Sequence, residues 1–189
     1  NSDFIIAGRM LGEVPLGIYR LAWSVSNIPV DKVSAMVTRT SQAFFSTAQK
    51  DYEALRRYLL GLTEGLALVT MPACAGLVLV SDPFVMLVLG PKWGGVVLPL
   101  RLLAVYAAIR SITPLIPPIL NVTGNSRFVA RTFIWPTIAL PTGFLFSSQW
   151  GAAGIAAGWI IMYPLSAMPL YWRAFRQIKV SFRQYLKAM

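Results

Sequence analysis

A row of polar side chains runs along the chain between positions 20 and 41, at alternating steps of three and four residues. In an α-helix this spacing places all of them on one face. The row consists of Arg20, Ser24, Asn27, Asp31, Ser34, Thr38 and Ser41. The opposite face is apolar and carries Ile18, Ala22, Val25, Pro29, Val33 and Met36. The spacing predicts an amphipathic helix. It lies among stretches so apolar that a lipid bilayer is the expected surrounding, so its polar face must point into protein or water, and a transport pathway is the simplest structure that needs such a face.

Charged residues give this face its chemistry. Asp31 and Lys32 fall near the middle of the segment. Deep in a membrane span an ionisable group costs about 2.5–3.5 kcal/mol, and it persists mostly where it faces a cavity or a partner. Lys32 shares an edge with Arg39, so the predicted face is cationic along one flank and at Arg20. Such a surface suits a large anionic ligand that carries hydroxyl groups, with Asp31 as a counter-ion or proton site.

The candidate substrate-binding residues are therefore Arg20, Ser24, Asn27, Asp31, Lys32, Ser34 and Arg39. The alternative is polar packing between helices, because small hydroxyl side chains also join neighbouring helices in membranes. Glu64 and Arg110 are two further ionisable residues in apolar stretches. They are expected either to form a structural ion pair or, together with Asp31, to take part in ion coupling.

The sequence lacks the residues that several kinds of catalysis, metal binding and phosphate binding require. The chain has no histidine, so it offers neither histidine acid–base catalysis nor a histidine metal site. Its single cysteine, Cys74, allows no disulfide within the chain, and no phosphate-binding loop of the GxxxxGK[ST] type is present. The few carboxylates are dispersed. The sequence thus predicts no catalytic residue, metal or cofactor, and a protein that is not an enzyme.

The composition indicates a membrane protein. The hydrophobic fraction is 56%, the charged fraction 13% and the mean hydropathy +0.61, against about 45–50% apolar and about 25% charged residues in soluble domains. The sequence predicts an all-α, multi-pass transmembrane helical bundle. Five full spans are predicted, at 16–41, 58–81, 96–122, 128–147 and 151–172, with the end of a sixth at 1–12. Proline recurs inside them, and each proline, Pro29 included, can kink its helix.

Loop charges predict the orientation. One side of the predicted bundle collects eleven basic residues and the other four, and cytoplasmic loops are the ones that accumulate Lys and Arg. The net charge of +10 is thereby explained without nucleic acid. The segment 173–189 alternates basic residues with apolar ones at helical spacing, which predicts a basic amphipathic tail on the anionic inner leaflet. The alternative is a solvated tail with incidental apolar residues.

Short motifs carry a family resemblance. Asp3, Gly8, Gly12, Gly17 and Tyr19 match the start of the second half of polysaccharide flippases. The segments 89–93 (LGPKW), 120–124 (LNVTG) and 151–154 (GAAG) are similar to that family's Leu-Gly-x-x-Trp loop, its Gly-ended turn and the Gly-rich start of a late span. The motifs come in the family's order over nearly the whole chain. One departure is the segment 43–46 (AFFS), which lacks the proline that the family carries before Phe-Ser.

The chain thus resembles the O-antigen and exopolysaccharide exporters of the multidrug/oligosaccharidyl-lipid/polysaccharide superfamily. The resemblance implies one lobe of a two-lobe transporter in the bacterial cytoplasmic membrane, partnered by membrane lipids and by the remaining transmembrane half of the same protein. It implies ion-gradient-driven movement of undecaprenyl-pyrophosphate-linked oligosaccharide, with the cationic flank towards pyrophosphate or acidic sugars. Alternatives are a multidrug or small-solute antiporter, a membrane-embedded glycan polymerase or ligase, and a purely structural subunit.

Overall fold

A computed structural model describes residues 2–48 and 51–187, apart from the side chains of residues 39, 40, 42, 43, 186 and 187. All regular structure in these residues is helical. The α-helices are α1 (Ser2–Ile6), α2 (Glu13–Thr47), α3 (Tyr52–Phe84), α4 (Val97–Ser111), α5 (Ile116–Val122), α6 (Ser126–Thr132), α7 (Ile134–Ser147), α8 (Gly151–Ile178) and α9 (Phe182–Lys187). The π- and 3₁₀-helical turns between them are η1 (Ala7–Leu11), η2 (Val85–Leu89), η3 (Pro91–Val96), η4 (Thr113–Leu115) and η5 (Ser148–Trp150).

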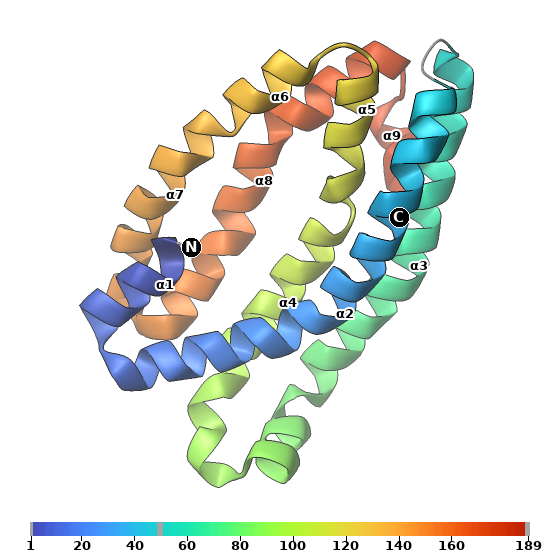
Figure 1. Ribbon diagram of the computed structural model, residues 1–189. Coiled ribbons are helices and arrows are strands. Elements are labelled where there is room, and N and C mark those ends of the chain that lie inside the picture. The colour runs from blue at the N-terminus through green and yellow to red at the C-terminus, as the bar shows by residue number, and fades with distance from the viewer. Residues whose placement is uncertain (1, 49–50, 188–189) are drawn as a thin grey trace.

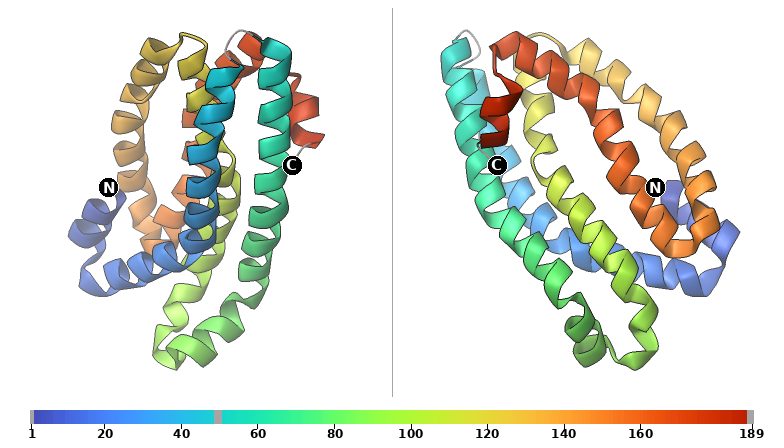
Figure 2. Two further views of the ribbon diagram at one scale, coloured as in Figure 1. Left: turned by 45° about the vertical axis from the view of Figure 1, so that its right-hand side comes forward. Right: turned by 180° about the vertical axis from the view of Figure 1, so that it is seen from behind.

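Helix α4 is central and packs against α2, α3 and α8 (Figure 1). Helix α7 lies beside α8, and α1 packs against α7. Helix α2 bends midway along its length, and it contains Pro29 (Figures 1 and 2). A proline in a helix interior removes one backbone hydrogen bond and collides with a carbonyl of the preceding turn, so this bend is the kink that the sequence predicts.

Three helical segments of the described residues are long and apolar enough to cross a membrane, namely Tyr52–Leu89, Pro91–Val122 and Ser126–Ile178. They contain all the predicted full spans except 16–41. That span lies in α2, which does not belong to this set because polar and charged residues recur along it. The predicted fold class, an all-α bundle of membrane helices, is confirmed, whereas the number of membrane passes stays a prediction.

The segment Ser126–Ile178 contains two predicted spans, 128–147 and 151–172, because the chain reverses direction within it. Helices α7 and α8 lie side by side and are joined by η5. Gly151 follows this turn with a φ of 69°, a left-handed backbone conformation that favours glycine. The reversal therefore occurs where the Gly-rich motif begins.

Two apolar cores hold the bundle together, one towards each end of α2. The first includes Ile6, Tyr19, Ala22, Val85, Val96, Leu100, Leu103, Phe144 and Ile155. The second includes Phe45, Leu55, Leu59, Leu66, Ile112, Leu115, Ile116, Ile119, Ile178 and Tyr185. Between them lies a small buried cluster of Val30, Cys74 and Ala107. The middle of the bundle thus has a thinner apolar core than its ends, which leaves room for polar residues.

The predicted tail, 173–189, begins inside α8 and includes α9. Helix α8 continues beyond the predicted boundary at residue 173 and ends at Ile178, where Lys179 adopts a left-handed backbone with a φ of 53°. Helix α9 then folds back onto the bundle (Figure 2), where Val180 and Tyr185 join the second core. Burial raises the pKa of the Tyr185 phenol. Part of the tail is therefore packed against protein, because its apolar residues complete this core.

A buried hydrogen-bond network in the first core gives one stability prediction. The Tyr19 hydroxyl donates to Asp3 Oδ2 at 3.0 Å and accepts from Trp159 Nε1 at 2.9 Å. We expect Tyr19→Phe to lower the free energy of unfolding by about 1–3 kcal/mol, because it leaves the buried Asp3 carboxylate and the partly buried Trp159 N–H without their partner. Denaturant unfolding in detergent, followed by circular dichroism, measures the change. Tyr58→Phe, on an exposed tyrosine, is the matched control, and an equal loss there would contradict the prediction.

Candidate functional site

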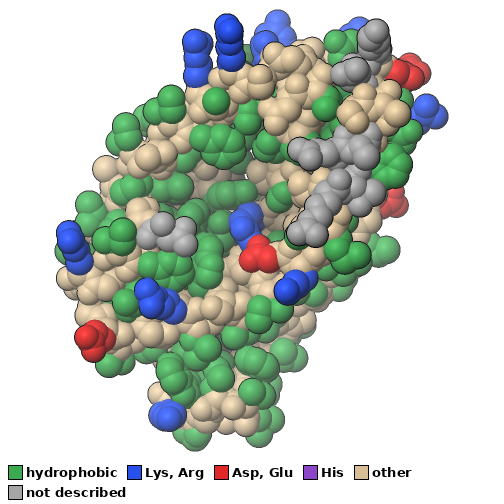
Figure 3. Space-filling model, viewed as in Figure 1, with side chains coloured by type: hydrophobic (Ala, Val, Ile, Leu, Met, Phe, Trp, Pro, Cys, Tyr) green, Lys and Arg blue, Asp and Glu red, His purple; other side chains and the backbone are tan. Residues whose placement is uncertain are grey.

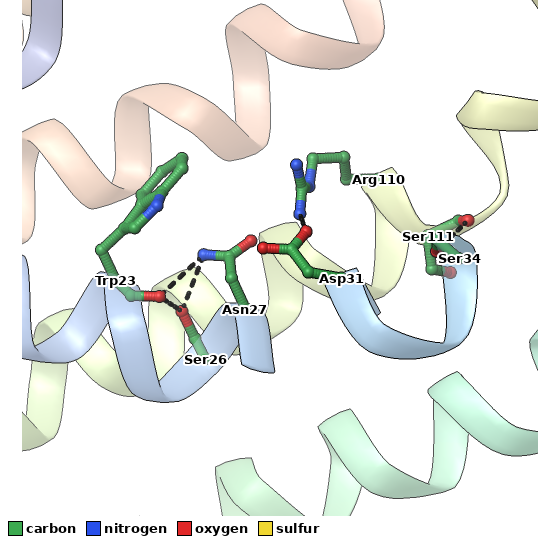
Figure 4. Close-up of polar contacts among 7 residues, drawn as sticks. All are labelled: Trp23, Ser26, Asn27, Asp31, Ser34, Arg110 and Ser111. Atoms are coloured by element: carbon green, nitrogen blue, oxygen red, sulfur yellow. Dashed lines mark hydrogen bonds and ion pairs between the residues drawn. The ribbon is translucent and has the colours of Figure 1, made fainter. Parts of the chain in front are cut away.

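An ion pair joins α2 to α4 between the two apolar cores. Arg110 Nη2 donates a hydrogen bond to Asp31 Oδ1, as Figure 4 shows. Asp31 follows the kink at Pro29, and Arg110 lies in the last turn of α4, just before the chain tightens into the 3₁₀ turn η4. The Asp31 side chain is 61% exposed and that of Arg110 26%. Within this chain the carboxylate is therefore accessible, while the guanidinium is held between helices.

Hydroxyl groups form a buried seam next to this ion pair. Ser34 Oγ donates to the Ser111 carbonyl at 3.2 Å, and Thr70 Oγ1 donates to Ser111 Oγ at 3.1 Å. All three residues are buried, and they come from α2, α4 and α3. Hydrogen bonds of this kind offset the cost of burying hydroxyl groups in an apolar bundle. Part of the predicted polar face thus packs between helices, as the alternative of polar helix–helix packing predicts for these residues.

Two cavities meet at Arg110. The smaller, of about 270 Å³, is lined by Val30, Asp31, Ser34, Ala35, Thr38, Arg110 and Pro114. The larger, of about 360 Å³, is lined by Arg110 and Pro114 together with residues of α4 to α8, among them Tyr106, Thr132, Trp159, Tyr163 and Ser166. Both cavities therefore share one guanidinium.

The face that carries the cavities is hollowed between α2 and the α7–α8 pair (Figure 3). Acidic and basic side chains meet beside this hollow, and apolar side chains surround them. The large apolar side chains exposed on the outer helices include Leu68, Leu79, Trp135, Ile138, Ile161 and Leu165. Apolar surface outside and a charged hollow inside is the arrangement expected when lipid, rather than water, surrounds the bundle.

The Arg110 guanidinium can form hydrogen bonds in addition to its ion pair with Asp31. Its Nε atom is buried and has no hydrogen-bond partner among the described residues. Its carbon Cζ lies 6.0 Å from the centre of the Tyr106 ring. Arginine offers five N–H donors in a planar fork and pairs well with phosphate or carboxylate groups. The site can therefore bind an anionic group, provided that this group competes with Asp31.

The structure brings together only some of the predicted substrate-binding residues. Asp31 and Ser34 line the smaller cavity, whereas Ser24 and Lys32 are exposed outside both cavities. Asn27 is buried and donates to the Trp23 carbonyl at 2.9 Å and to Ser26 Oγ at 3.2 Å (Figure 4).

The predicted cationic flank is only partly defined. The Arg20 guanidinium lies 5.6 Å from the ring centre of Phe4, close to α1 and away from both cavities. The side chain of Arg39 lies outside the described residues. Asp31 and Arg110 form an ion pair at the cavities, and the binding of an anionic ligand by the cationic flank stays a prediction.

Of the two alternatives for Glu64 and Arg110, a structural ion pair or a role in ion coupling, the structure contradicts the ion pair. Arg110 pairs with Asp31, and Glu64 is exposed on α3 instead of being buried. The cause is geometric: the last turn of α4 faces the kinked middle of α2, which offers the nearer carboxylate. The role of Asp31, Glu64 and Arg110 in ion coupling stays a prediction.

Sequence reasoning missed Ser111, Thr70 and the aromatic wall of the larger cavity. Ser111 directly follows Arg110, and this adjacency of a charge and a hydroxyl in an apolar helix is the signal that could have identified it. The rings of Tyr106 and Trp159, 4.9 Å apart, come from α4 and α8. No local pattern links them. Over residues 2–48 and 51–187, no group of three or more Cys, Asp or Glu residues gathers that could hold a metal ion.

The long apolar helices and the charged site inside the bundle define a multi-pass membrane protein. The chain belongs to the polysaccharide biosynthesis protein family, whose family model matches residues 1–98. The predicted resemblance to polysaccharide flippases is confirmed at the level of the family.

Three relatives illustrate this membership. The chain is 27% identical to the lipopolysaccharide biosynthesis protein WzxC of Escherichia coli (strain K12), over 100% of this chain and 39% of WzxC. It is 40% identical to the teichuronic acid biosynthesis protein TuaB of Bacillus subtilis (strain 168), over 58% of this chain and 23% of TuaB. An uncharacterized membrane protein in the cps region of Klebsiella pneumoniae is 32% identical, over 88% of this chain and 34% of that protein.

The chain thus spans between 23% and 39% of the length of these relatives. No solved structure matches it.

Proposed function

We propose that this chain is one lobe of a flippase that moves a lipid-linked oligosaccharide across the bacterial cytoplasmic membrane for polysaccharide export. The observation that carries the proposal is the Asp31–Arg110 ion pair, which lies at the junction of two cavities in the middle of an apolar bundle. A membrane protein retains such charges mainly for a substrate or ion pathway. Its relatives named for lipopolysaccharide and teichuronic acid biosynthesis support glycan cargo.

In this proposal Arg110 binds the anionic part of the cargo, a pyrophosphate or an acidic sugar. The cargo competes with Asp31 for the guanidinium, so binding opens the ion pair. Hydroxyl and aromatic groups of the larger cavity, such as Tyr106, Thr132 and Ser166, then face the sugars and hydrogen-bond to their hydroxyl groups. The cargo envisaged is an oligosaccharide on undecaprenyl pyrophosphate.

Asp31 is proposed to couple the cycle to an ion gradient. Once Arg110 has bound the cargo, the carboxylate is free to take a proton or a cation from one side of the membrane. Release of that ion restores the ion pair and expels the cargo. The kink at Pro29 lies just before Asp31 and allows the two halves of α2 to reorient, as broken or kinked helices do in other transporters.

The test of the proposal is Asp31→Asn in the full-length protein, expressed in its native host. We expect surface polysaccharide to fall by about tenfold or more, because the neutral side chain binds Arg110 too weakly to expel the cargo: hydrogen bonds to charged groups contribute about 1.5–3 kcal/mol, and 1.4 kcal/mol is a tenfold change. Immunoblots of cell-surface glycan, normalised to the amount of membrane-inserted protein, measure the effect. The variant also cannot accept a proton at position 31.

Asp82→Asn is the matched control, because Asp82 forms the comparable α3–α4 ion pair with Arg101 outside both cavities. Normal glycan display in Asp31→Asn, or an equal loss in both variants, would contradict the proposal. If the protein is instead a small-solute antiporter, Asp31→Asn is expected to change resistance to toxic solutes and to leave glycan display intact.

A further inference from the structure

A second polar pocket lies at the end of the bundle where α3 begins and α8 ends. It has a volume of about 600 Å³ and is lined by Tyr52, Glu53, Arg56, Arg173, Arg176, Gln177, Ile178 and Lys179. Four of these side chains are cationic and one is a carboxylate. Residues far apart in sequence therefore build one concentrated positive site, separate from both cavities that meet at Arg110.

The positive charge of this pocket is not balanced within the described chain. The two ion pairs found among the described residues, Arg101–Asp82 and Arg110–Asp31, both lie elsewhere. Two of the arginines are held in place by other contacts. Arg173 donates to Asn125 Oδ1 at 3.1 Å and 2.9 Å, and the Arg176 guanidinium lies 6.0 Å from the ring centre of Trp172. These contacts orient cationic groups without neutralising them.

The depth of the pocket in the membrane indicates what supplies the missing negative charge. Its residues fall just outside the predicted spans 58–81 and 151–172, which is the level of the lipid headgroups. Tyr52 and the neighbouring Trp172 are aromatic residues of the type enriched at that level. Basic side chains project from this end of the molecule in Figure 3. A pocket of clustered arginines at headgroup depth fits a phosphate group.

We propose that this pocket binds the phosphate group of an anionic membrane lipid and thereby anchors the start of α3 to the end of α8. Arg56 and Lys179 approach the phosphate from the two helices, and Arg173 and Arg176 complete the cationic lining. The lipid chains extend along the exposed apolar surface of the bundle. Binding here requires no opening of the Asp31–Arg110 ion pair, so the site is independent of the transport proposal.

The test compares lipid binding to the purified full-length protein and to a double variant, Arg56→Gln with Lys179→Asn. Asparagine tolerates the left-handed backbone at position 179. Thermal unfolding is followed while phosphatidylglycerol or phosphatidylcholine is titrated into the detergent. We expect phosphatidylglycerol alone to stabilise the wild type and its affinity to fall about thirtyfold in the variant, because each basic residue near an anionic headgroup contributes about 1 kcal/mol.

The double variant Arg57→Gln with Arg183→Gln is the control, since it removes the same charge at exposed residues outside the pocket. Retained phosphatidylglycerol binding there supports the proposal, and an equal loss overturns it in favour of diffuse attraction. A third arm titrates inorganic phosphate and pyrophosphate. Stabilisation by these free anions without any response to phosphatidylglycerol would also overturn the lipid assignment. If the pocket variant does not fold, Arg56→Gln alone serves in its place.

Discussion

Reversing the charge of Arg110 (Arg110→Asp) is expected to abolish polysaccharide display while the protein still inserts into the membrane. The variant places two carboxylates where the ion pair lies, and like charges at one site raise each other's free energy. It also removes the guanidinium that both cavities share. We expect a loss of about 100-fold or more, larger than for Asp31→Asn, because the variant removes charged hydrogen bonds to the cargo, each worth about 1.5–3 kcal/mol, and adds a carboxylate that repels it. Cell-surface glycan per inserted protein is the measurement.

Exchanging the charges at positions 31 and 110 tests whether display depends on the ion pair itself or on which residue carries each charge. The double variant Asp31→Arg with Arg110→Asp keeps one acid and one base in contact, so it is expected to recover part of the glycan display. Arg101→Asp is the control at the ion pair with Asp82, whose side chains are 40% and 55% exposed. There the loss should stay below about fivefold, because this ion pair lies outside both cavities and its loss leaves the Asp31–Arg110 pair intact. Equal defects in the Arg101 and Arg110 variants would contradict a special role for the cavity.

The polar row along α2 illustrates what sequence can and cannot provide. Its spacing correctly predicts one long helix with a polar and an apolar face, since helical periodicity is a local property. The spacing does not say which polar residues are covered. Asn27 and Ser34 are buried, whereas Ser24 and Asp31 are exposed, because α4 packs over only part of this face.

The partner of Arg110 depends on information that a single sequence does not contain. Asp31 precedes Arg110 by 79 residues, and Glu64 is the only carboxylate considered from the sequence as a partner for Arg110. The choice is set by the kink at Pro29 and by the register between α2 and α4, both of which depend on packing. Composition predicts that a buried charge needs a partner, and only the assembled bundle identifies that partner.

The end of α8 likewise depends on packing. Basic residues from Arg173 onward predict the end of the membrane span, and long basic side chains can extend to the headgroups while the backbone stays helical. The helix therefore continues to Ile178, and the apolar residues Val180 and Tyr185 are used in a core. A pattern of alternating basic and apolar residues does not distinguish packing on lipid from packing on protein.

The turn between α7 and α8 is expected to be the position most sensitive to a small substitution. A Cβ atom added at Gly154 would lie 2.1 Å from the Ser147 carbonyl oxygen and 2.8 Å from Trp150 Cβ. Because the closest atom belongs to the backbone, the two helices must separate to admit even a methyl group. We expect Gly154→Val to lower the free energy of unfolding by at least about 1–3 kcal/mol, the usual cost of overpacking, and to reduce the yield of folded protein in detergent.

Gly65→Val is the matched control, because a Cβ atom at Gly65 in α3 meets nothing within 4 Å. Valine there is expected to be neutral or mildly stabilising, since glycine is a poor helix former. The effect at Gly154 should also reach the candidate site, because Trp159 lies further along the same helix and lines the larger cavity. A Gly154→Val protein as stable as the Gly65→Val protein would show that α7 and α8 do not pack as closely as the turn requires. The close packing of α7 and α8 would then not explain how Trp159 is held against Tyr106 beside Arg110.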